Sequence, residues 1–121
     1  MERKGNAGHI SHTSYGDFFS LYIKECATVC ESKSYKSFSL QDVKRYKDFR
    51  SSIDQQYLEY IIRTIQDNIK TAVVAYRLDT VVITVENLFC KEITSFFIER
   101  LFDVTIEDAY GNCNLITIKW Q

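Results

Sequence analysis

The sequence contains no proline and only four glycines among its 121 residues. Neither helix-breaking residue occurs between Ser51 and Arg77. Apolar side chains recur through this stretch at steps of three and four, so we predict a helix of about seven turns with one apolar stripe. Ser52 and Gln55 form a capping-box pattern at its start. The stripe consists of Ile53, Tyr57, Leu58, Ile61, Ile62, Ile65, Ile69, Ala72, Val73 and Tyr76.

Long hydrophobic runs are also missing. No apolar run approaches the roughly 20 residues that a membrane-spanning helix needs. Residues Met1 to Ser14 are polar and lack the apolar stretch of a signal peptide. We therefore expect a protein that is not secreted and has no membrane partner, located in the cytoplasm or inside a particle. In such a compartment the four cysteines are expected to be reduced.

Net charge is nearly absent as well. The formal charge of −1 gives no overall attraction to nucleic acid or membrane surfaces. The charge is unevenly spread, since residues 1–50 carry nine Lys/Arg against six Asp/Glu, and residues 51–121 carry six against ten. Hydrophobic residues make up 45% and aromatic residues 14%, which is enough for the core of one domain.

The N-terminal half is expected to be helical. Residues 1–13 are small and polar and predict a flexible arm. Ser14 starts a helix over 15–31, and the serine-rich stretch 32–39 is a linker. A short helix over 40–50 then precedes Ser51-Ser52, which we expect to end it.

The C-terminal half alternates helices and strands. Residues 71–77 either extend the long helix or pair as a strand with a strand over 80–85. We favour the helix, because the Leu78-Asp79 turn lacks the positive-φ residues that short hairpins use. Asn87 should cap a helix over 88–102. Strands around Val104–Ile106 and over 115–120 complete the unit.

These elements predict an α+β fold. It consists of a small three-stranded mixed or antiparallel sheet with a long helix and a crossover helix, preceded by an N-terminal helical extension. Residues 14–121 form the domain, with the extension over 14–50 and the helix–strand–helix–strand–strand unit over 51–121. The last strand either lies at an edge or inserts between the other two. One sheet face should carry both helices.

The order of elements over residues 53–120 resembles small proteins of tailed phages and large DNA viruses. The resemblance lies in the TVVITV strand, in Asp103-Val104-Thr105-Ile106, and in the terminal LITIKW strand with Ile118-Lys119-Trp120. It departs at Leu101-Phe102-Asp103, where a Gly-aromatic pair is common. The resemblance implies a viral origin, in the host-cell cytoplasm or within a virion, and carries no defined activity or functional residue.

No catalytic or cofactor motif stands out. His9, His12, Cys26 and Cys30 contain zinc-binding residue types, but their spacing matches no common zinc finger. Cys90, near a helix N-terminus, is a weak candidate nucleophile. We favour packing of reduced thiols for all of these cysteines. We therefore predict no catalytic residue, no metal, no cofactor and no enzymatic activity.

Three surfaces are candidates for binding a partner. A basic segment with Lys44, Arg45, Lys47 and Arg50 could contact phosphates of a nucleic acid. An acidic surface could mimic nucleic acid, as in a small viral inhibitor of a host defence nucleoprotein of the anti-CRISPR kind. The acidic residues are Glu99, Asp103, Glu107 and Asp108.

The third candidate surface is aromatic. Seven rings of the N-terminal half exceed what two short helices can bury, so some should form an interaction site. They are Phe18, Phe19, Tyr22, Tyr35, Phe38, Tyr46 and Phe49. We therefore expect a non-enzymatic protein-binding or assembly protein, a virion or accessory component, that uses this segment to bind itself or another protein.

Overall fold

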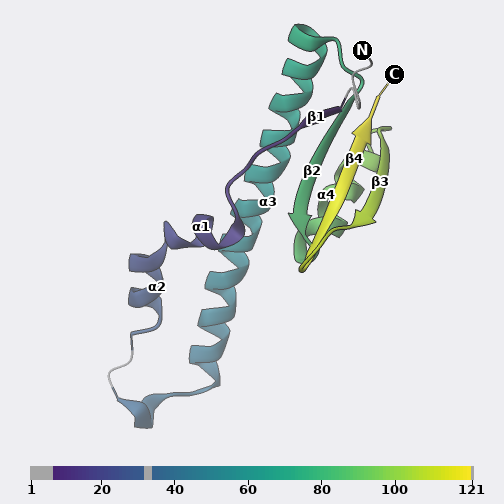
Figure 1. Ribbon diagram of the computed structural model, residues 1–121. Coiled ribbons are helices and arrows are strands. Elements are labelled where there is room, and N and C mark those ends of the chain that lie inside the picture. The colour runs from purple at the N-terminus through teal and green to yellow at the C-terminus, as the bar shows by residue number, and fades with distance from the viewer. Residues whose placement is uncertain (1–6, 32–33, 121) are drawn as a thin grey trace. The chain divides into compact units, whose positions relative to one another are not determined.

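The computed structural model describes residues 7–31 and 34–120. Its elements follow the order β1–α1–α2–η1–α3–β2–α4–β3–β4, where η1 is a 3-10 helix (Figure 1). The predicted α+β class is confirmed, but the described sheet has four strands and not three. The chain divides into two compact units. Residues 13–59 form the helical unit, and the described residues before Thr13 join those from Tyr60 onward in the sheet unit.

Helix α3 (Leu40–Tyr76) is one helix of 37 residues. The predicted break at Ser51-Ser52 is wrong, because a serine inside a helix costs only about 0.5 kcal/mol relative to alanine. Ser52 is therefore not an N-cap. The helix begins after Ser39, whose backbone N–H donates to Asp42 Oδ2 at 2.7 Å, as in a capping box. This hydrogen bond, aided by Arg45, lowers the pKa of the Asp42 carboxyl.

The C-terminal end of α3 confirms the helical alternative for residues 71–76. Arg77 takes a positive φ of 55°, and the Leu78 N–H donates to the Ala72 carbonyl at 2.8 Å. These are features of a left-handed helix C-cap. Val73 and Tyr76, predicted in the apolar stripe, are exposed, so the buried part of the stripe ends at Ala72.

The sheet has the strand order β1-β2-β4-β3. Strand β4 (Cys113–Lys119) lies between β2 (Thr80–Glu86) and β3 (Asp103–Asp108) and is antiparallel to both. This confirms the inserted alternative for the last strand. The register places Ile83 opposite Ile116, and both side chains are fully buried.

Strand β1 (Ala7–His9) pairs parallel with β2 at the sheet edge. These residues lie in the stretch for which the sequence predicted a flexible arm, whose residues 1–6 lie outside the described residues. The pairing of β1 uses backbone groups, and the Ile10 N–H adds a hydrogen bond to the Val82 carbonyl at 2.9 Å. A three-residue strand with little apolar alternation gives no sequence signal.

Helix α4 (Asn87–Ile98) packs against β2, β3 and β4, and lies behind the sheet in the view of Figure 1. It ends before the predicted Phe102, because Leu101 takes a φ of 71° and the Phe102 N–H turns back to the Phe97 carbonyl at 3.1 Å. The buried side chains of the sheet unit are mainly aliphatic and aromatic. They include Ile61, Ile65, Val81, Ile83, Phe89, Ile93, Phe97, Ile116 and Ile118.

The helical unit contains α1 (Tyr15–Ser20), α2 (Ile23–Val29), η1 (Tyr35–Ser37) and the first half of α3. The single helix predicted over 15–31 is wrong. The N–H groups of Leu21 and Tyr22 bond to carbonyls three residues back, at 3.1 and 2.8 Å, and this tightening ends α1. The predicted Ser14 cap is confirmed by its bond from the Asp17 N–H. Of the predicted linker, residues 32–33 lie outside the described residues.

The buried centre of the stripe gives a stability prediction. Ile61 and Ile65 are fully buried, so Ile61→Ala or Ile65→Ala should each lower the free energy of unfolding by about 2–5 kcal/mol. Chemical denaturation measures this loss. Val74→Ala is the matched control on the same helix, because Val74 is 83% exposed and should cost less than about 0.5 kcal/mol. A loss below about 1 kcal/mol at the isoleucines would contradict their role in the core.

Candidate protein-binding surface

The rings of α1 pack against the first half of α3. Tyr15 and Phe18 both meet the Tyr57 ring edge-on, with centroids 5.2 Å apart in each pair. Phe19 lies 6.3 Å from Phe49. The Tyr57 hydroxyl donates to the Thr13 carbonyl at 2.9 Å. Three of the predicted partner-binding rings, Phe18, Phe19 and Phe49, therefore help to hold the helical unit together.

Polar bonds reinforce this aromatic packing. The Tyr15 hydroxyl donates to Asp54 Oδ1 at 2.5 Å, and Arg50 forms an ion pair with the same oxygen at 3.1 Å. The Arg50 guanidinium also lies over the Tyr15 ring, 5.0 Å from its centroid. Burial and the bond to Asp54 raise the pKa of Tyr15 to about 12. The predicted Tyr22 donates to Gln56 Oε1 at 2.6 Å.

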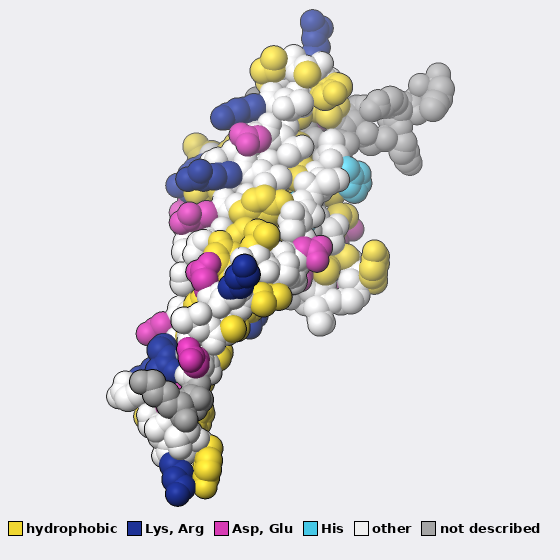
Figure 2. All heavy atoms as spheres, turned by 90° about the vertical axis from the view of Figure 1, so that its left-hand side faces the viewer, with side chains coloured by type: hydrophobic (Ala, Val, Ile, Leu, Met, Phe, Trp, Pro, Cys, Tyr) yellow, Lys and Arg dark blue, Asp and Glu magenta, His cyan; other side chains and the backbone are white. Residues whose placement is uncertain are grey.

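An apolar groove of about 470 Å³ is formed by residues of α1 and α2. Ile23, which lines the groove, is 62% exposed, and Leu21, the C-cap residue of α1, is 73% exposed. Figure 2 looks onto the side of Figure 1 where α1 and α2 lie, and shows hydrophobic side chains between charged ones. We call this surface the α1–α2 groove. It is lined by Tyr15, Gly16, Phe19, Ser20, Ile23, Cys26 and Ala27.

Of these lining residues, only Phe19 is predicted from the sequence as a partner-binding residue. Leu21 and Ile23 are not among the predicted site residues. The sequence predicts one unbroken helix over 15–31, and in such a helix the exposed positions differ from those of the two short helices in the structure. The signal that could have found them is the run of three large apolar residues, Leu21-Tyr22-Ile23, which does not fit the spacing of a single helical stripe.

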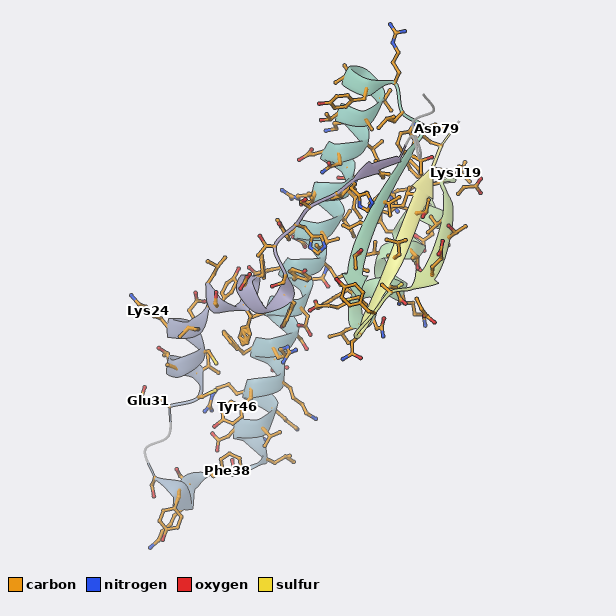
Figure 3. The ribbon with its side chains drawn as sticks, viewed as in Figure 1. Lys24, Glu31, Phe38, Tyr46, Asp79 and Lys119 are labelled. Carbon is orange, nitrogen blue, oxygen red and sulfur yellow. The ribbon has the colours of Figure 1, made fainter. Side chains whose placement is uncertain are left out.

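The remaining predicted rings lie near η1 and the start of α3. Tyr35 is 83% exposed and Phe38 is 57% exposed, and the neighbouring Leu40 is 67% exposed. Phe38 lies 6.3 Å from Tyr46, and Figure 3 shows both residues at this end of the helical unit. These side chains extend the apolar surface of the unit beyond the groove.

The predicted basic contacts divide into two pairs. Arg45 forms an ion pair with Asp42 at 3.0 Å, and its Nε donates to the Val29 carbonyl at 3.1 Å. Arg50 is engaged with Asp54 and Tyr15 as described above. Lys44 and Lys47 are exposed. The two arginines therefore have structural partners inside the helical unit, and the two lysines present their charge to solvent.

The predicted acidic residues do not share one face of the sheet unit. Side chains alternate along a strand, so Asp103 and Glu107 of β3 point to one side and Asp108 points to the other. Asp103 lies opposite Lys119 in the strand register. Glu99 follows the end of α4, which covers the face toward which Asp108 points. All four are exposed.

The sequence candidates for metal binding and catalysis are placed as follows. Burial and a hydrogen bond with the Cys30 thiol raise the pKa of Cys26. His12 Nε2 lies 2.7 Å from the Thr84 carbonyl. Cys90 is only 6% exposed, which leaves little access for a substrate. Within the described ranges, no group of three or more His, Cys, Asp or Glu side chains is placed to hold a metal ion.

No protein-family description, curated protein or solved structure matches the chain. None of the helices in the described part of the chain has the length and apolar character to cross a membrane.

The Tyr15–Asp54 bond predicts a pH-dependent stability. Because folding raises the pKa of Tyr15 to about 12, its contribution should be fully present below pH 10 and be lost as the pH rises toward 12. Over this window, the native chain should lose about 1–3 kcal/mol more stability than Tyr15→Phe. Denaturant unfolding at several pH values measures both proteins. All other ionisable groups are the same in the two proteins, so parallel pH curves would refute the coupling.

Proposed function

We propose that the chain is a non-enzymatic protein-binding protein that assembles with a second copy of itself through the helical unit. One observation carries the proposal. Ile23 lines the α1–α2 groove and is 62% exposed, and Leu21, in the turn between the two helices, is 73% exposed. Exposed apolar surface of this kind usually marks an interaction site. The same unit therefore offers both a recess and the side chains that can fill it.

The charges at the groove favour a second copy over a partner of one charge sign. Lys24 and Glu25 lie in the first turn of α2, and Glu31 follows its end, so this short element carries charges of both signs. Figure 3 shows the side chains of Lys24 and Glu31 on the outer side of α2. A two-fold axis across α2 would place Lys24 of one copy near Glu31 of the other. Two-fold dimers are the commonest symmetric assemblies.

The other readings have weaker support. Contact with nucleic acid is favoured only by the exposed Lys44 and Lys47, since Arg45 and Arg50 have internal ion pairs. Inhibition through an acidic surface is disfavoured by the distribution of the acidic side chains over both sides of the sheet. A virus-encoded virion or accessory role is supported by the resemblance of residues 53–120 alone, and it is compatible with self-assembly.

Sedimentation equilibrium of the full chain tests the proposal. We expect a concentration-dependent dimer that Ile23→Asp abolishes, because a carboxylate in an apolar interface is strongly unfavourable. Val74→Asp is the matched control, since Val74 is a comparably exposed apolar residue outside the helical unit. Circular dichroism must show the same helix content for all variants. Truncation at residue 50 is unsuitable, because it removes β1 and the start of α3.

A charge swap tests the two-fold arrangement itself. Lys24→Glu should weaken the dimer by like-charge repulsion, and Lys24→Glu combined with Glu31→Lys should restore it. A wild-type chain that remains monomeric at every soluble concentration would overturn the proposal. So would a dimer that Ile23→Asp and Val74→Asp leave equally intact.

A further inference from the structure

A second pocket lies within the sheet unit, between α3 and α4, with a volume of about 360 Å³. It is independent of the α1–α2 groove and shares no residue with it. Its wall consists mainly of aromatic and aliphatic side chains. The described lining residues also include two cations and no acidic residue. They are Gln66, Ile69, Lys70, Phe96, Phe97, Arg100 and Phe102.

The aromatic wall is held by the end of α4. Phe97 is 1% exposed, and its ring meets Phe96 and Phe102 edge-on, at centroid distances of 5.0 and 5.4 Å. The positive φ of Leu101 turns the chain so that Phe102 returns to Phe97. Three rings fixed edge-to-face in this way form a preorganised apolar surface.

Two cations stand beside this wall. The Arg100 guanidinium lies 3.6 Å from the centroid of the Phe96 ring, and Nη1 donates to the Phe96 carbonyl at 2.9 Å. These contacts position Arg100, while its side chain remains 52% exposed. Lys70 is more exposed, at 77% of its side chain.

Both cations keep hydrogen-bonding capacity for an anion. Lys70 is 3.8 Å from Asp67, and Arg100 is 3.9 Å from Glu99. Both distances exceed the hydrogen-bond range of 2.7–3.2 Å. In the helical unit, by contrast, the arginine–aspartate pairs close to 3.0 and 3.1 Å.

We propose that this pocket binds a small amphipathic anion, an organic acid whose acidic group is held by Lys70 and Arg100. The apolar body of the ligand packs against the three phenylalanine rings and Ile69. Charge-assisted hydrogen bonds fix the head, and burial of the body supplies most of the affinity. The volume lies within the range of small-molecule sites. The Gln66 side chain supplies an additional polar group at the wall.

The fluorescent anion 1-anilinonaphthalene-8-sulfonate is the direct probe. We expect saturable binding to the full chain, weakened by about 10- to 100-fold in the double variant Lys70→Gln/Arg100→Gln. Arg63→Gln/Lys119→Gln is the matched control, since it removes two other exposed cations of the sheet unit. Thermal unfolding checks that both variants fold.

Competition and amide chemical shifts locate the site and define the ligand class. Dodecanoate and 2-naphthoate represent an aliphatic and an aromatic acid, and displacement of the probe by at least one of them is expected. Dodecanol, which lacks the acidic group, should compete much more weakly. The shifts should change at Gln66, Lys70 and residues 96–102. Equal binding by the two double variants, or shifts confined to the α1–α2 groove, would overturn the proposal.

Discussion

The amphipathic stripe of α3 is the constraint on which both units depend. In the helical unit, Tyr57 of this stripe receives the rings of Tyr15 and Phe18. In the sheet unit, Ile61 and Ile65 are fully buried. A helix in water gains little from propensity alone, so burial of the stripe is what stabilises α3. The uninterrupted periodicity also explains why two serines in the middle of the helix do not end it.

Sequence reasoning succeeded where apolar periodicity is long and failed where backbone bonds or single caps decide. The C-terminal end of α3 near residue 76 and strand β2 follow from side-chain patterns, whereas the insertion of β4 is one of two alternatives that the patterns left open. Strand β1 could not be predicted, because its pairing uses main-chain groups of a short and irregular segment. The turn between α1 and α2 was not predicted for a related reason. It is formed by two backbone i→i−3 hydrogen bonds, which leave no side-chain pattern in the sequence.

The candidate sites show the same limit for charged residues. A sequence shows that Arg45, Arg50, Lys70 and Arg100 are cations but not which carboxylates lie near them. The structure separates two arginines with close aspartate partners from two cations whose nearest carboxylates lie beyond hydrogen-bond distance. Lys70 and Arg100 form only the longer ion pairs, at 3.8 and 3.9 Å, so they can bind an external anion without first breaking a hydrogen-bonded pair. The basic segment of the sequence predicted Arg45 and Arg50 as phosphate contacts, although both are paired with aspartates. A basic segment alone is therefore weak support for binding of phosphates.

The exposed apolar surface of the helical unit rests on elements too short to be stable alone. Helices α1 and α2 have six and seven residues, far fewer than the 12–15 that an isolated helix needs. Three hydrogen bonds within the unit tie these helices to α3. Tyr15 donates to Asp54, Tyr22 donates to Gln56, and Arg45 donates to the Val29 carbonyl. A partner that binds only the folded groove therefore stabilises these ties by mass action. Loss of the ties would, conversely, weaken the proposed association by removing the folded surface, even though none of these polar bonds needs to touch the partner.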